Sequence, residues 1–490
     1  MSNESLCSQL NPARLWHHFS RLTEIPRSSG NEEAVRQYIF QWATQLGFEC
    51  HIDGIGNLVV WVPASPDHGH HSITVLQSHL DMVCERDPGS LYDAEQGRIH
   101  IVRDGDWLKA DGTTLGADNG IGVAAMMAAA EDTSFNRGPL DLLFTIDEEV
   151  GLTGAANFDP SLIRGRRLIN LDTEESGMIC IGCAGGVDSR MLWNVGRELT
   201  PAQWTGLRIS LTGCVGGHSG MEIHHNRGNA IRLNARLLAA IQATTPMMLQ
   251  TISGGNKRNA IPRECETVIW IPDGNVDNVR KQIMTTASQL KSEYLKTDPD
   301  ILCEIFPVPV SKGISAYLPE DSTTLVSFLQ ALPTGVISMS SEIPGLVQTS
   351  TNLAVVRMIS DDIEVVSSSR SSIPEELIAV VESIAKITSR ANVNCNLEHA
   401  YPGWRPNLHS NVLGTVKQAF DEIRQESPNV SCVHCGLECG LIGERIGGMD
   451  MVSIGPDIQG VHAPGERVHI ESVKDFWKIL TRTLSLCCDS

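Results

Sequence analysis

Apolar positions in the first part of the chain recur at helical spacing. Between Asn31 and Gly47 they include Val35, Ile39 and Leu46, which fall on one side of a helical period. Asparagine at the start and glycine at the end are typical of helix caps. This segment is therefore predicted to be a helix.

Short apolar runs bounded by Gly, Pro or acidic residues follow, and they have the length of buried strands. Between them, residues 120–130 (GIGVAAMMAAA) are small, apolar and favourable to a helix. The alternation of strands and helices predicts an α/β fold with a mostly parallel sheet and flanking helices. The predicted strands are residues 57–62 (NLVVWV), 73–77 (ITVLQ), 140–146 (LDLLFTI) and 167–171 (RLINL).

The residues that follow these strands are of the types that bind hard or borderline metal ions. Ligands of such sheets bind at the carboxyl ends of the strands. Another apolar run, residues 451–456 (MVSIGP), leads through a short loop to a histidine. One aspartate lies directly before the small-residue helix, where the helix N-terminus favours an acidic group. The candidate metal ligands are His79, Asp118, Glu149, Asp172 and His462.

Two histidines and three carboxylates match the ligands of a two-metal centre. Zn²⁺ accepts imidazole nitrogen and carboxylate oxygen, and two ions about 4 Å apart share a bridging carboxylate. We predict that Asp118 is the bridge. His79 and Asp172 are assigned to one ion, and Glu149 and His462 to the other. Two Zn²⁺ per subunit are expected, although Co²⁺ or Mn²⁺ would fit the same ligands.

Two acidic residues beside these ligands have predicted roles. Asp81 lies two residues beyond His79 on an extended segment, so it can accept the second ring N–H of that histidine. Glu148 is adjacent to Glu149 and need not bind a metal ion, which leaves it free to act as the general base. The predicted mechanism is attack on a peptide carbonyl by a hydroxide that bridges the ions, with Glu148 passing the water proton to the leaving amine.

Two other clusters of metal-binding residue types have simpler interpretations. His68, His70 and His71 lie before a strand in a loop rich in Pro, Asp and Gly, and we interpret them as a solvated turn. Residues 432–439 (CVHCGLEC) are similar to a zinc knuckle but lack a second spaced pair of ligands. We interpret their thiols as packing residues.

Composition limits the partners and the compartment. A chain of 490 residues exceeds the usual size of one core, so two domains are expected. The net charge of -20 argues against binding to nucleic acid or to an anionic membrane surface. The start of the chain lacks the features of a signal peptide, no apolar run has the length of a membrane span, and the 14 cysteines lack the spacing of a disulfide framework. We therefore expect a cytoplasmic protein.

A series of short motifs carries a resemblance to a known family. The motifs are HLD from His79, GADNG from Gly116, DEEVG from Asp147, NLD from Asn170, GGHSG from Gly216 and NAIP from Asn259. Together they resemble the di-zinc metallopeptidases, which include carnosinases, tripeptidases, carboxypeptidase G and acetylornithine deacetylase. Further segments resemble the bacterial dipeptidases of that family, so the likeness covers nearly the whole chain. These segments are IPRSSGNEE from Ile25, TSTNLA from Thr349, YPGW from Tyr401, HCGLECG from His434 and GPDIQGVHAPGE from Gly455.

In that family an inserted lid domain interrupts the catalytic domain, and the pattern of this chain fits such an insertion. We expect a catalytic domain in residues 1–206 and 401–490, and an α+β lid and dimerisation domain in residues 207–400. The resemblance implies a homodimer, in which His218 of the GGHSG motif stabilises the tetrahedral oxyanion, often from the partner subunit. It also implies that Asn259 contacts the substrate.

Two charged residues are candidates for binding the ends of a short peptide. Arg370 follows a run of serines, and its planar guanidinium suits a C-terminal carboxylate. Glu438 is similar to a family residue that pairs with the free α-amino group. The resemblance implies that the substrates are unblocked dipeptides, with Xaa-His peptides including carnosine favoured.

Two alternatives stay open. An N-acyl amino-acid deacylase would use the same metal site without requiring a free α-amine, so cleavage of acetylated substrates distinguishes it. A catalytically silent metal-binding scaffold would keep the fold and the ligands but hydrolyse no amide.

Overall fold

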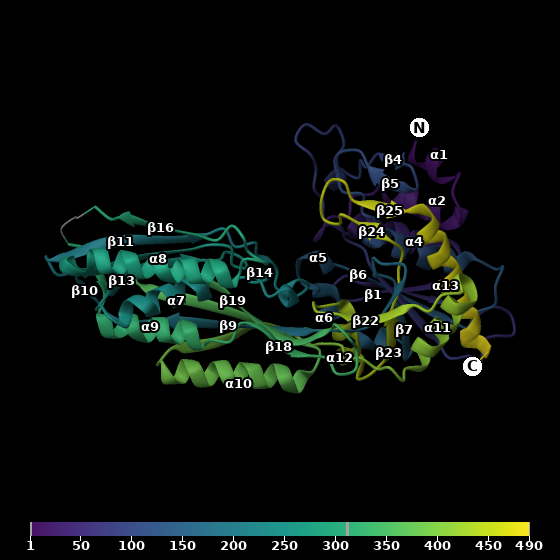
Figure 1. Cartoon of the computed structure of the whole chain (residues 1–490). Helices are drawn as coiled ribbons and strands as arrows, with labels where there is room; N and C mark the ends of the chain where they lie inside the picture. The colour runs from purple at the N-terminus through teal and green to yellow at the C-terminus, as the bar shows by residue number, and fades with distance from the viewer. Residues whose placement is uncertain (1, 310–312, 490) are drawn as a thin grey trace. The chain divides into compact units, whose positions relative to one another are not determined.

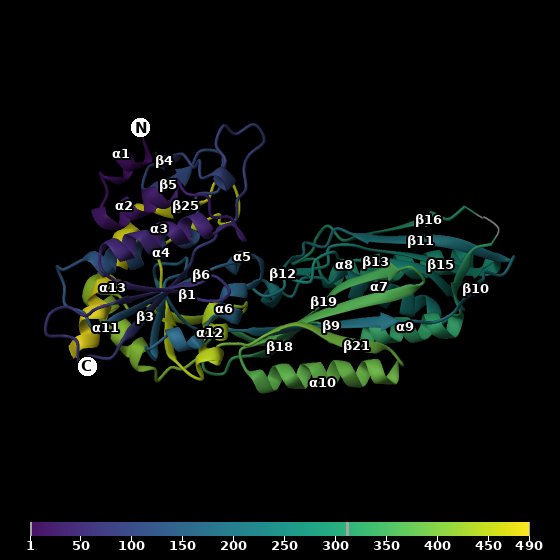
Figure 2. The same cartoon turned by 180° about the vertical axis from the view of Figure 1, so that it is seen from behind.

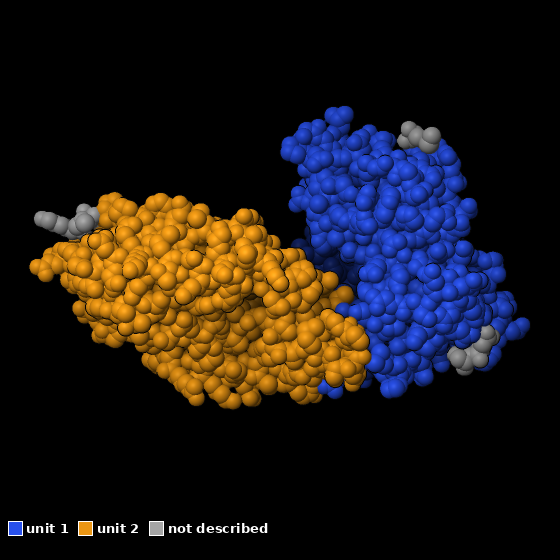
Figure 3. All heavy atoms as spheres, in the orientation of Figure 1, with its two compact units in different colours: residues 1–183, 404–432, 437–490 blue, residues 184–403, 433–436 orange. Residues whose placement is uncertain are grey.

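The computed structural model describes residues 2–309 and 313–489, and the chain forms two compact units. Unit 1 contains residues 1–183, 404–432 and 437–490, and unit 2 contains residues 184–403 and 433–436 (Figure 3). Unit 2 is therefore inserted within the sequence of unit 1, as in the predicted arrangement of an interrupted domain.

The residues at which the chain passes between the units differ from the predicted boundaries. Residues 184–206, which we expected in the catalytic domain, lie in unit 2, and so do residues 401–403 and 433–436. The reason is strand pairing: β9 (Gly185–Trp193) pairs along its length with β20 (Asp362–Ser371) and with β21 (Asn394–Tyr401). These strands belong to the sheet of unit 2.

A sheet of eight strands forms the centre of unit 1 (Figure 1). Its middle strands β6, β3, β7 and β23 run parallel. The flanking strands pair antiparallel, β1 with β2, β2 with β6, and β8 with β23. In sheet order the strands are β1 (Glu49–Ile52), β2 (Leu58–Val62), β6 (Leu140–Thr145), β3 (Thr74–His79), β7 (Arg167–Asn170), β23 (Asp450–Ser453), β8 (Met178–Cys183) and β22 (Asn429–Val433).

Helices and a second, smaller sheet complete unit 1. The smaller sheet has the strand order β24 (Ile458–Gln459), β25 (Arg467–His469), β5 (Trp107–Ala110) and β4 (Ile101–Asp104). The pairing of β25 with β5 brings the segment after His462 beside the segment before Asp118. The helices are α1 (Asn3–Cys7), α2 (Ala13–Leu22), α3 (Glu33–Gln45), α4 (Ala117–Glu131), α5 (Glu148–Gly151), α6 (Thr153–Asn157), α11 (Asn411–Arg424), α12 (Glu438–Ile446) and α13 (Ile470–Asp489).

Close packing of α4 against the sheet explains why that helix consists of small apolar residues. Every residue of β3 and of β6 is buried, and α4 is buried around almost its whole circumference. A Cβ atom on Gly122 would lie only 2.6 Å from the carbonyl oxygen of Leu171. The start of α4, which carries Asp118, is thereby held beside the carboxyl ends of β3 and β7.

The predicted elements of this unit are confirmed. The first predicted helix is α3, the four apolar runs are β2, β3, β6 and β7, and the small-residue segment is α4. The α/β class is also confirmed, with the parallel strands in the middle of the sheet.

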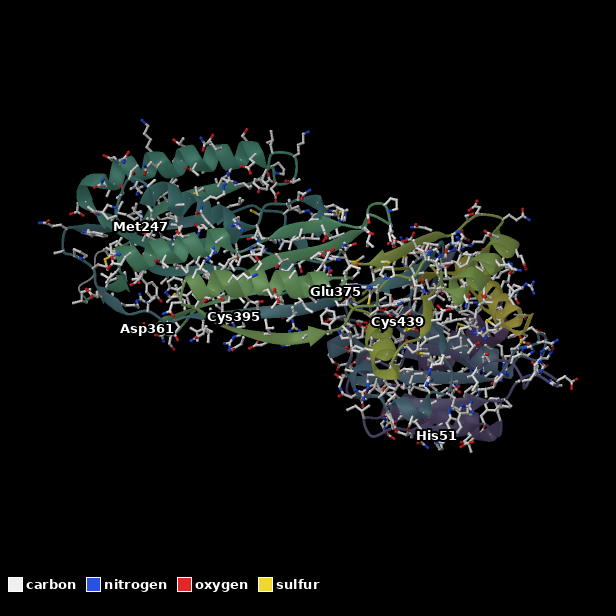
Figure 4. All side chains as sticks on the ribbon, turned by 90° about the horizontal axis from the view of Figure 1, so that it is seen from below. His51, Met247, Asp361, Glu375, Cys395 and Cys439 are labelled. Atoms are coloured by element: carbon white, nitrogen blue, oxygen red, sulfur yellow. The ribbon has the colours of Figure 1, made fainter. Side chains whose placement is uncertain are left out.

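Unit 2 is an α+β layer structure with a sheet of 11 strands (Figure 1). Helices α7 (Ala230–Gln242), α8 (Val276–Glu293), α9 (Pro319–Ala331) and α10 (Pro374–Arg390) share one apolar core with this sheet. Figure 2 shows α10 running beside the sheet, where it packs on β9, β20 and β21. Met247, labelled in Figure 4, belongs to this core, whereas Cys439, also labelled, is buried in unit 1.

The strands of unit 2 form the 11-stranded sheet and one short pair, β12 with β14. Those not yet given are β10 (Arg197–Leu199), β11 (Trp204–Thr212), β12 (Gly217–His218), β13 (Met248–Gly254), β14 (Ala260–Ile261), β15 (Cys265–Pro272), β16 (Leu302–Pro307), β17 (Ser315–Tyr317), β18 (Gly335–Met339) and β19 (Val347–Ile359). Within residues 2–309 and 313–489, no helix combines the length and the apolar character that crossing a membrane requires.

Candidate metal centre

The carboxyl ends of three neighbouring parallel strands in unit 1 carry metal-binding side chains. β3 ends at His79, β6 leads into Glu148 and Glu149, and β7 leads into Asp172. Asp118 lies in the first turn of α4, and His462 lies in the loop between β24 and β25. The peptide bond between Asp118 and Asn119 is cis, and His462 has a left-handed backbone with a φ of 63°.

The five predicted ligands form two triads that share Asp118. In one triad, Nε2 of His79 lies 3.0 Å from Oδ1 of Asp118 and 3.4 Å from Oδ1 of Asp172. In the other, Nε2 of His462 lies 3.3 Å from Oδ2 of Asp118 and 2.9 Å from Oε2 of Glu149. The two oxygens of Asp118 therefore face different triads, which is the grouping that the sequence predicted.

The electrostatics of these triads favour positive charge. Burial alone would lower the pKa of His79, but Asp172, Asp118 and Asp81 raise it well above its ordinary value. Hydrogen bonds to Asp118 and Glu149 raise the pKa of His462 to about 11. The carboxylates of both triads therefore favour a positively charged partner, and a metal ion would supply that charge.

The donor atoms fit a metal ion. Both triads offer only imidazole nitrogen and carboxylate oxygen, which suit Zn²⁺, Co²⁺ or Mn²⁺. Oε1 of Glu149 is buried and has no hydrogen-bond partner among the described residues. A buried carboxylate oxygen without a partner is costly, and coordination to an ion would satisfy it.

Asp81 links a histidine of one triad to the acidic pair after β6. Nδ1 of His79 lies 3.1 Å from the backbone oxygen of Asp81 and 3.4 Å from its carboxylate. The same carboxylate accepts the backbone N–H groups of Glu148 at 3.0 Å and of Glu149 at 3.2 Å. Burial raises the pKa of Asp81, but hydrogen bonds from His79 and Ser29 lower it to about 2. Asp81 thus stays ionised and orients both segments.

Glu148 lies beside the triads at the start of α5. One of its oxygens, a ring nitrogen of His79 and a carboxylate oxygen of Glu149 lie within 4.8 Å of one another, so one ion could bind all three. Burial is the main reason that the pKa of Glu148 lies well above its ordinary value, and the neighbouring acidic groups raise it further. A carboxylate with a raised pKa is a stronger base, which suits a group that accepts a proton from water.

Two buried charged residues that the sequence analysis did not identify hold the loops of this site. Oε1 and Oε2 of Glu466 accept the backbone N–H groups of residues 115–118. The guanidinium of Arg27 donates to the backbone oxygens of Leu80, Asp81 and Gly116. Both lie in segments that carry the family resemblance. Their positions in the sequence, however, do not show that they contact the loops of the metal centre.

Glu438 also lies in unit 1, at the first position of α12, and only 1% of it is exposed. Its Oε2 accepts hydrogen bonds from Gln77 at 2.6 Å and from Thr145 at 2.8 Å. Its Oε1 is buried and has no hydrogen-bond partner in the described part of the chain. Burial raises the pKa of Glu438 to about 8, and Asp172 contributes to that shift.

The remaining predicted site residues belong to unit 2, and His218 has a defined tautomer there. Strand β12 places His218 opposite Ala260 of β14, and Ser219 donates to the backbone oxygen of Asn259 at 2.8 Å. Nδ1 of His218 accepts the N–H groups of Gly220 at 3.2 Å and Met221 at 3.0 Å. Burial lowers the pKa of His218, with a smaller effect from Arg370. The neutral ring therefore carries its proton on Nε2 and can donate it in a hydrogen bond.

Arg370 belongs to a polar cluster of unit 2. It is 8% exposed, donates to the hydroxyl of Tyr401 at 2.8 Å, and has a buried Nε without a hydrogen-bond partner among the residues described. His434 also belongs to the cluster, with its Nε2 2.7 Å from Oγ of Ser350. Burial lowers the pKa of His434 to about 3, and the charge of Arg370 contributes. The sequence places His434 in a motif similar to a zinc knuckle and in the HCGLECG segment of the family resemblance, but it does not predict the contact with Ser350, which is distant in sequence.

Comparison with known proteins gives consistent results along the chain. Residues 75–486 match the sequence profile of peptidase family M20/M25/M40. The chain is 38% identical over 477 residues to the cytosol non-specific dipeptidase of Escherichia coli, covering 97% of this chain and 98% of that protein. Its structure matches the crystal structure of aminoacylhistidine dipeptidase from Vibrio alginolyticus with a TM-score of 0.91, and 98% of each chain is covered. The two sequences are 36% identical.

A more distant structure shares the fold. The aminopeptidase PepT from Bacillus cereus is 16% identical with a TM-score of 0.56, covering 98% of this chain and 99% of that chain. The similarities to the two dipeptidases extend over both units, so they concern the whole chain and not unit 1 alone.

Proposed function

The chain belongs to peptidase family M20/M25/M40, and on that premise we propose that it is a metal-dependent dipeptidase. Its substrates are unblocked dipeptides, including Xaa-His peptides such as carnosine. Two relatives that match almost the whole chain are named as dipeptidases. The single observation that carries the proposal is the pair of triads that share Asp118, with the partly buried carboxyl of Glu148 beside them.

The proposed metal centre holds two Zn²⁺, one at His79, Asp118 and Asp172, and one at Asp118, Glu149 and His462. When bound, the ions would supply Lewis acidity and lower the pKa of water toward about 7. Glu148 takes the water proton on its carboxylate and delivers it to the leaving amine. Asp81 keeps His79 and the backbone of Glu148 in place through the hydrogen bonds described above.

Four further residues are proposed to bind the substrate and its transition state. The Nε2–H of His218 donates to the carbonyl oxygen as negative charge develops there. Oε1 of Glu438, which has no hydrogen-bond partner among the described residues, accepts the α-ammonium group, and the guanidinium of Arg370 binds the C-terminal carboxylate. Asn259 contributes a further polar contact to the substrate. These roles require an unblocked N-terminus, which distinguishes a dipeptidase from an N-acyl amino-acid deacylase.

The assembly, metal and compartment are parts of the same proposal. We propose a homodimer with Zn²⁺ as the resident metal, and Co²⁺ or Mn²⁺ as functional replacements. A cytoplasmic location is supported by the name of the Escherichia coli relative and by the 14 cysteines, all of which are thiols in the structure. The high negative charge supports partners that are small molecules and not nucleic acid.

The test compares matched substrates on metal-stripped protein before and after zinc is restored. The substrates are carnosine, its N-acetylated form, and an Xaa-Leu dipeptide that measures the preference for histidine. We expect zinc-dependent cleavage of the unblocked peptides only, and its loss in Glu148→Gln. Preference for the acetylated form would assign a deacylase, and stoichiometric zinc binding without hydrolysis of any amide would assign a silent scaffold.

A histidine-specific pocket is tested by the two unblocked peptides. Faster turnover of the Xaa-His peptide, measured as kcat/KM, would support specificity for histidine. Equal values would indicate the broader dipeptidase activity for which the Escherichia coli relative is named.

A further inference from the structure

A second cluster of metal-binding side chains lies in unit 1, made of residues that the two triads do not use. Ring nitrogens of His68 and His71 and the thiol of Cys488 lie within 4.8 Å of one another. The histidines belong to the loop between β2 and β3, and Cys488 lies in the last turn of α13. We call these three residues the loop–helix cluster.

The loop that carries the two histidines is ordered by its own hydrogen bonds. His68 N–H donates to the backbone oxygen of Ser65 at 3.0 Å, and His71 N–H donates to that of His68 at 3.3 Å. Ser65 is itself held by Arg137, whose backbone oxygen accepts the Ser65 N–H at 3.0 Å. This hydrogen-bonded turn keeps two imidazoles on the same side of the loop, and its exposed residues Gly69 and His70 agree with the solvated turn that the sequence predicts.

One atom of the cluster lacks the contact that its environment requires. Nδ1 of His68 is buried and has no hydrogen-bond partner among the residues that the structure describes. The ring of His68 stacks on that of His71 with centroids 5.3 Å apart. A metal ion would satisfy this nitrogen and would draw together two rings and a thiol that already lie side by side.

We propose that His68, His71 and Cys488 bind a Zn²⁺-type ion that is separate from the two-metal centre. Two imidazole nitrogens and one thiolate form three corners of a tetrahedral site, and water completes the fourth, because His68 and His71 are only partly buried. A thiolate ligand excludes Mg²⁺, Ca²⁺ and Mn²⁺ and selects Zn²⁺, Co²⁺ or a similar thiophilic ion.

Arg137, whose backbone oxygen holds Ser65, is a buried cation whose charge interacts with Cys488. Its guanidinium is buried and fixed by the backbone oxygens of Pro63, Ala129 and Ala130. Burial lowers the pKa of Arg137, and Cys488 acts in the opposite direction, so the two groups interact electrostatically. A nearby fixed cation stabilises a thiolate, the form of cysteine that binds metal.

The bound ion would join two parts of unit 1 that are far apart in sequence. It would tie the end of α13 to the loop that leads into β3, the strand that ends at His79. An ion that binds the folded protein but not the unfolded chain stabilises the fold by mass action. The proposed role of the site is therefore structural, and it does not depend on the dipeptidase activity.

Cobalt spectroscopy tests the proposal, because the two sites differ in their ligands. The two triads contain only nitrogen and oxygen donors, so thiolate-to-cobalt charge transfer in the near-ultraviolet has to come from a cysteine. The full chain without a histidine tag is stripped of metal and titrated with Co²⁺. The variant is Cys488→Ser, and the matched control is Cys487→Ser, since the thiol of Cys487 faces Thr74 and Arg167 instead of the loop histidines.

We expect a thiolate–cobalt band in the wild type and in Cys487→Ser, and its loss in Cys488→Ser. The double variant His68→Ala/His71→Ala should weaken Co²⁺ binding at this site by at least about 100-fold. Loss of a residue that only hydrogen-bonds to a metal ligand lowers metal affinity by about 10- to 100-fold, and loss of two ligands should lower it further. Zn²⁺ should raise the Tm of the wild type more than that of Cys488→Ser. Absence of the band from the wild type, or its persistence in Cys488→Ser, would overturn the proposal.

Discussion

The carboxylate of Glu466 accepts a hydrogen bond from the backbone N–H of Asp118 at 3.2 Å. The same carboxylate accepts the N–H groups of Leu115, Gly116 and Ala117 at distances of 2.7 to 2.9 Å. Glu466 lies in the segment that also carries His462. One buried side chain therefore fixes the turn that carries Asp118, the proposed shared ligand, and connects it to the loop of His462, a proposed terminal ligand.

Replacing Glu466 with glutamine should weaken metal binding. Each oxygen of Glu466 accepts two N–H groups, so the amide NH2 of glutamine would face two donors and leave them unsatisfied. The turn would shift, and we expect the affinity for zinc to fall by about 10- to 100-fold, as for other residues that orient metal ligands. Zinc titration of metal-stripped protein measures the effect directly.

The control for that variant is Glu471→Gln. Glu471 is exposed on α13, where its carboxylate pairs with Lys474 at 2.8 Å. Its replacement should leave the zinc affinity unchanged. Equal zinc affinity in Glu466→Gln and the wild type would mean that the turn at Asp118 holds its shape without this carboxylate.

Glu148→Gln should abolish most activity without removing metal. The adjacent Glu149 belongs to a triad, whereas Glu148 is assigned to proton transfer, and general-base catalysis contributes about 10²- to 10⁴-fold. We expect kcat to fall by that factor while both ions remain bound. Glu149→Gln should instead reduce the metal content. Because one oxygen of Glu148 also lies close to His79, loss of an ion from Glu148→Gln would reassign Glu148 as a ligand.

The elements that hold the metal centre could be predicted because local pattern and strand direction suffice for them. β3, β6 and β7 are short runs rich in apolar residues, and parallel strands place the residues that follow them at one edge of the sheet. His79, Glu149 and Asp172 could therefore be grouped without coordinates. The shared position of Asp118 required one further idea, which is that two ions need a bridging carboxylate.

Other features depend on contacts between distant segments, which periodicity does not encode. Arg27 reaches the oxygens of Leu80 and Gly116, and Glu466 reaches residues 115–118, from opposite ends of the chain. The proximity of Cys488 to His68 is likewise a contact between segments that are far apart in the sequence. The expected boundary at residue 207 differs from the start of unit 2 because β9 pairs with β20 and β21, and periodicity does not show which sheet a strand joins.

Glu131 should stabilise unit 1 in a pH-dependent way. It joins α2, α3 and α4 through an ion pair with Arg14, a 3.3 Å contact with His18 and a 2.5 Å hydrogen bond from Trp42. Burial raises the pKa of Glu131, but His18, Arg14 and Trp42 lower it to about 2 from 4.5. A lowered folded-state pKa contributes stability that is complete above pH 4.5 and is lost as the pH falls through about 2.

We therefore expect Glu131→Gln to lower the free energy of unfolding by about 1 to 3 kcal/mol at neutral pH, with the difference shrinking as the solution is acidified. Denaturant unfolding of metal-stripped wild type and variant at several pH values measures this difference. Metal is removed beforehand so that its release in acid does not contribute to the pH dependence. A difference that stays constant down to pH 2 would assign the stabilisation to the neutral hydrogen bond from Trp42.

Mixing of two inactive variants should reveal whether His218 acts on the substrate bound by its own subunit or by the partner subunit. His218 lies in unit 2 and Glu148 in unit 1, so His218→Ala and Glu148→Ala each remove a function from a different unit. His218→Ala alone should lower kcat by about 10²- to 10³-fold through loss of a donor to the oxyanion.

If His218 acts across a dimer interface, a heterodimer of the two variants contains one complete site, because one subunit keeps Glu148 and the other keeps His218. Random exchange then restores about a quarter of the wild-type activity. If His218 acts within its own subunit, no site in the heterodimer is complete, and heterodimers demonstrated by mass spectrometry would remain inactive.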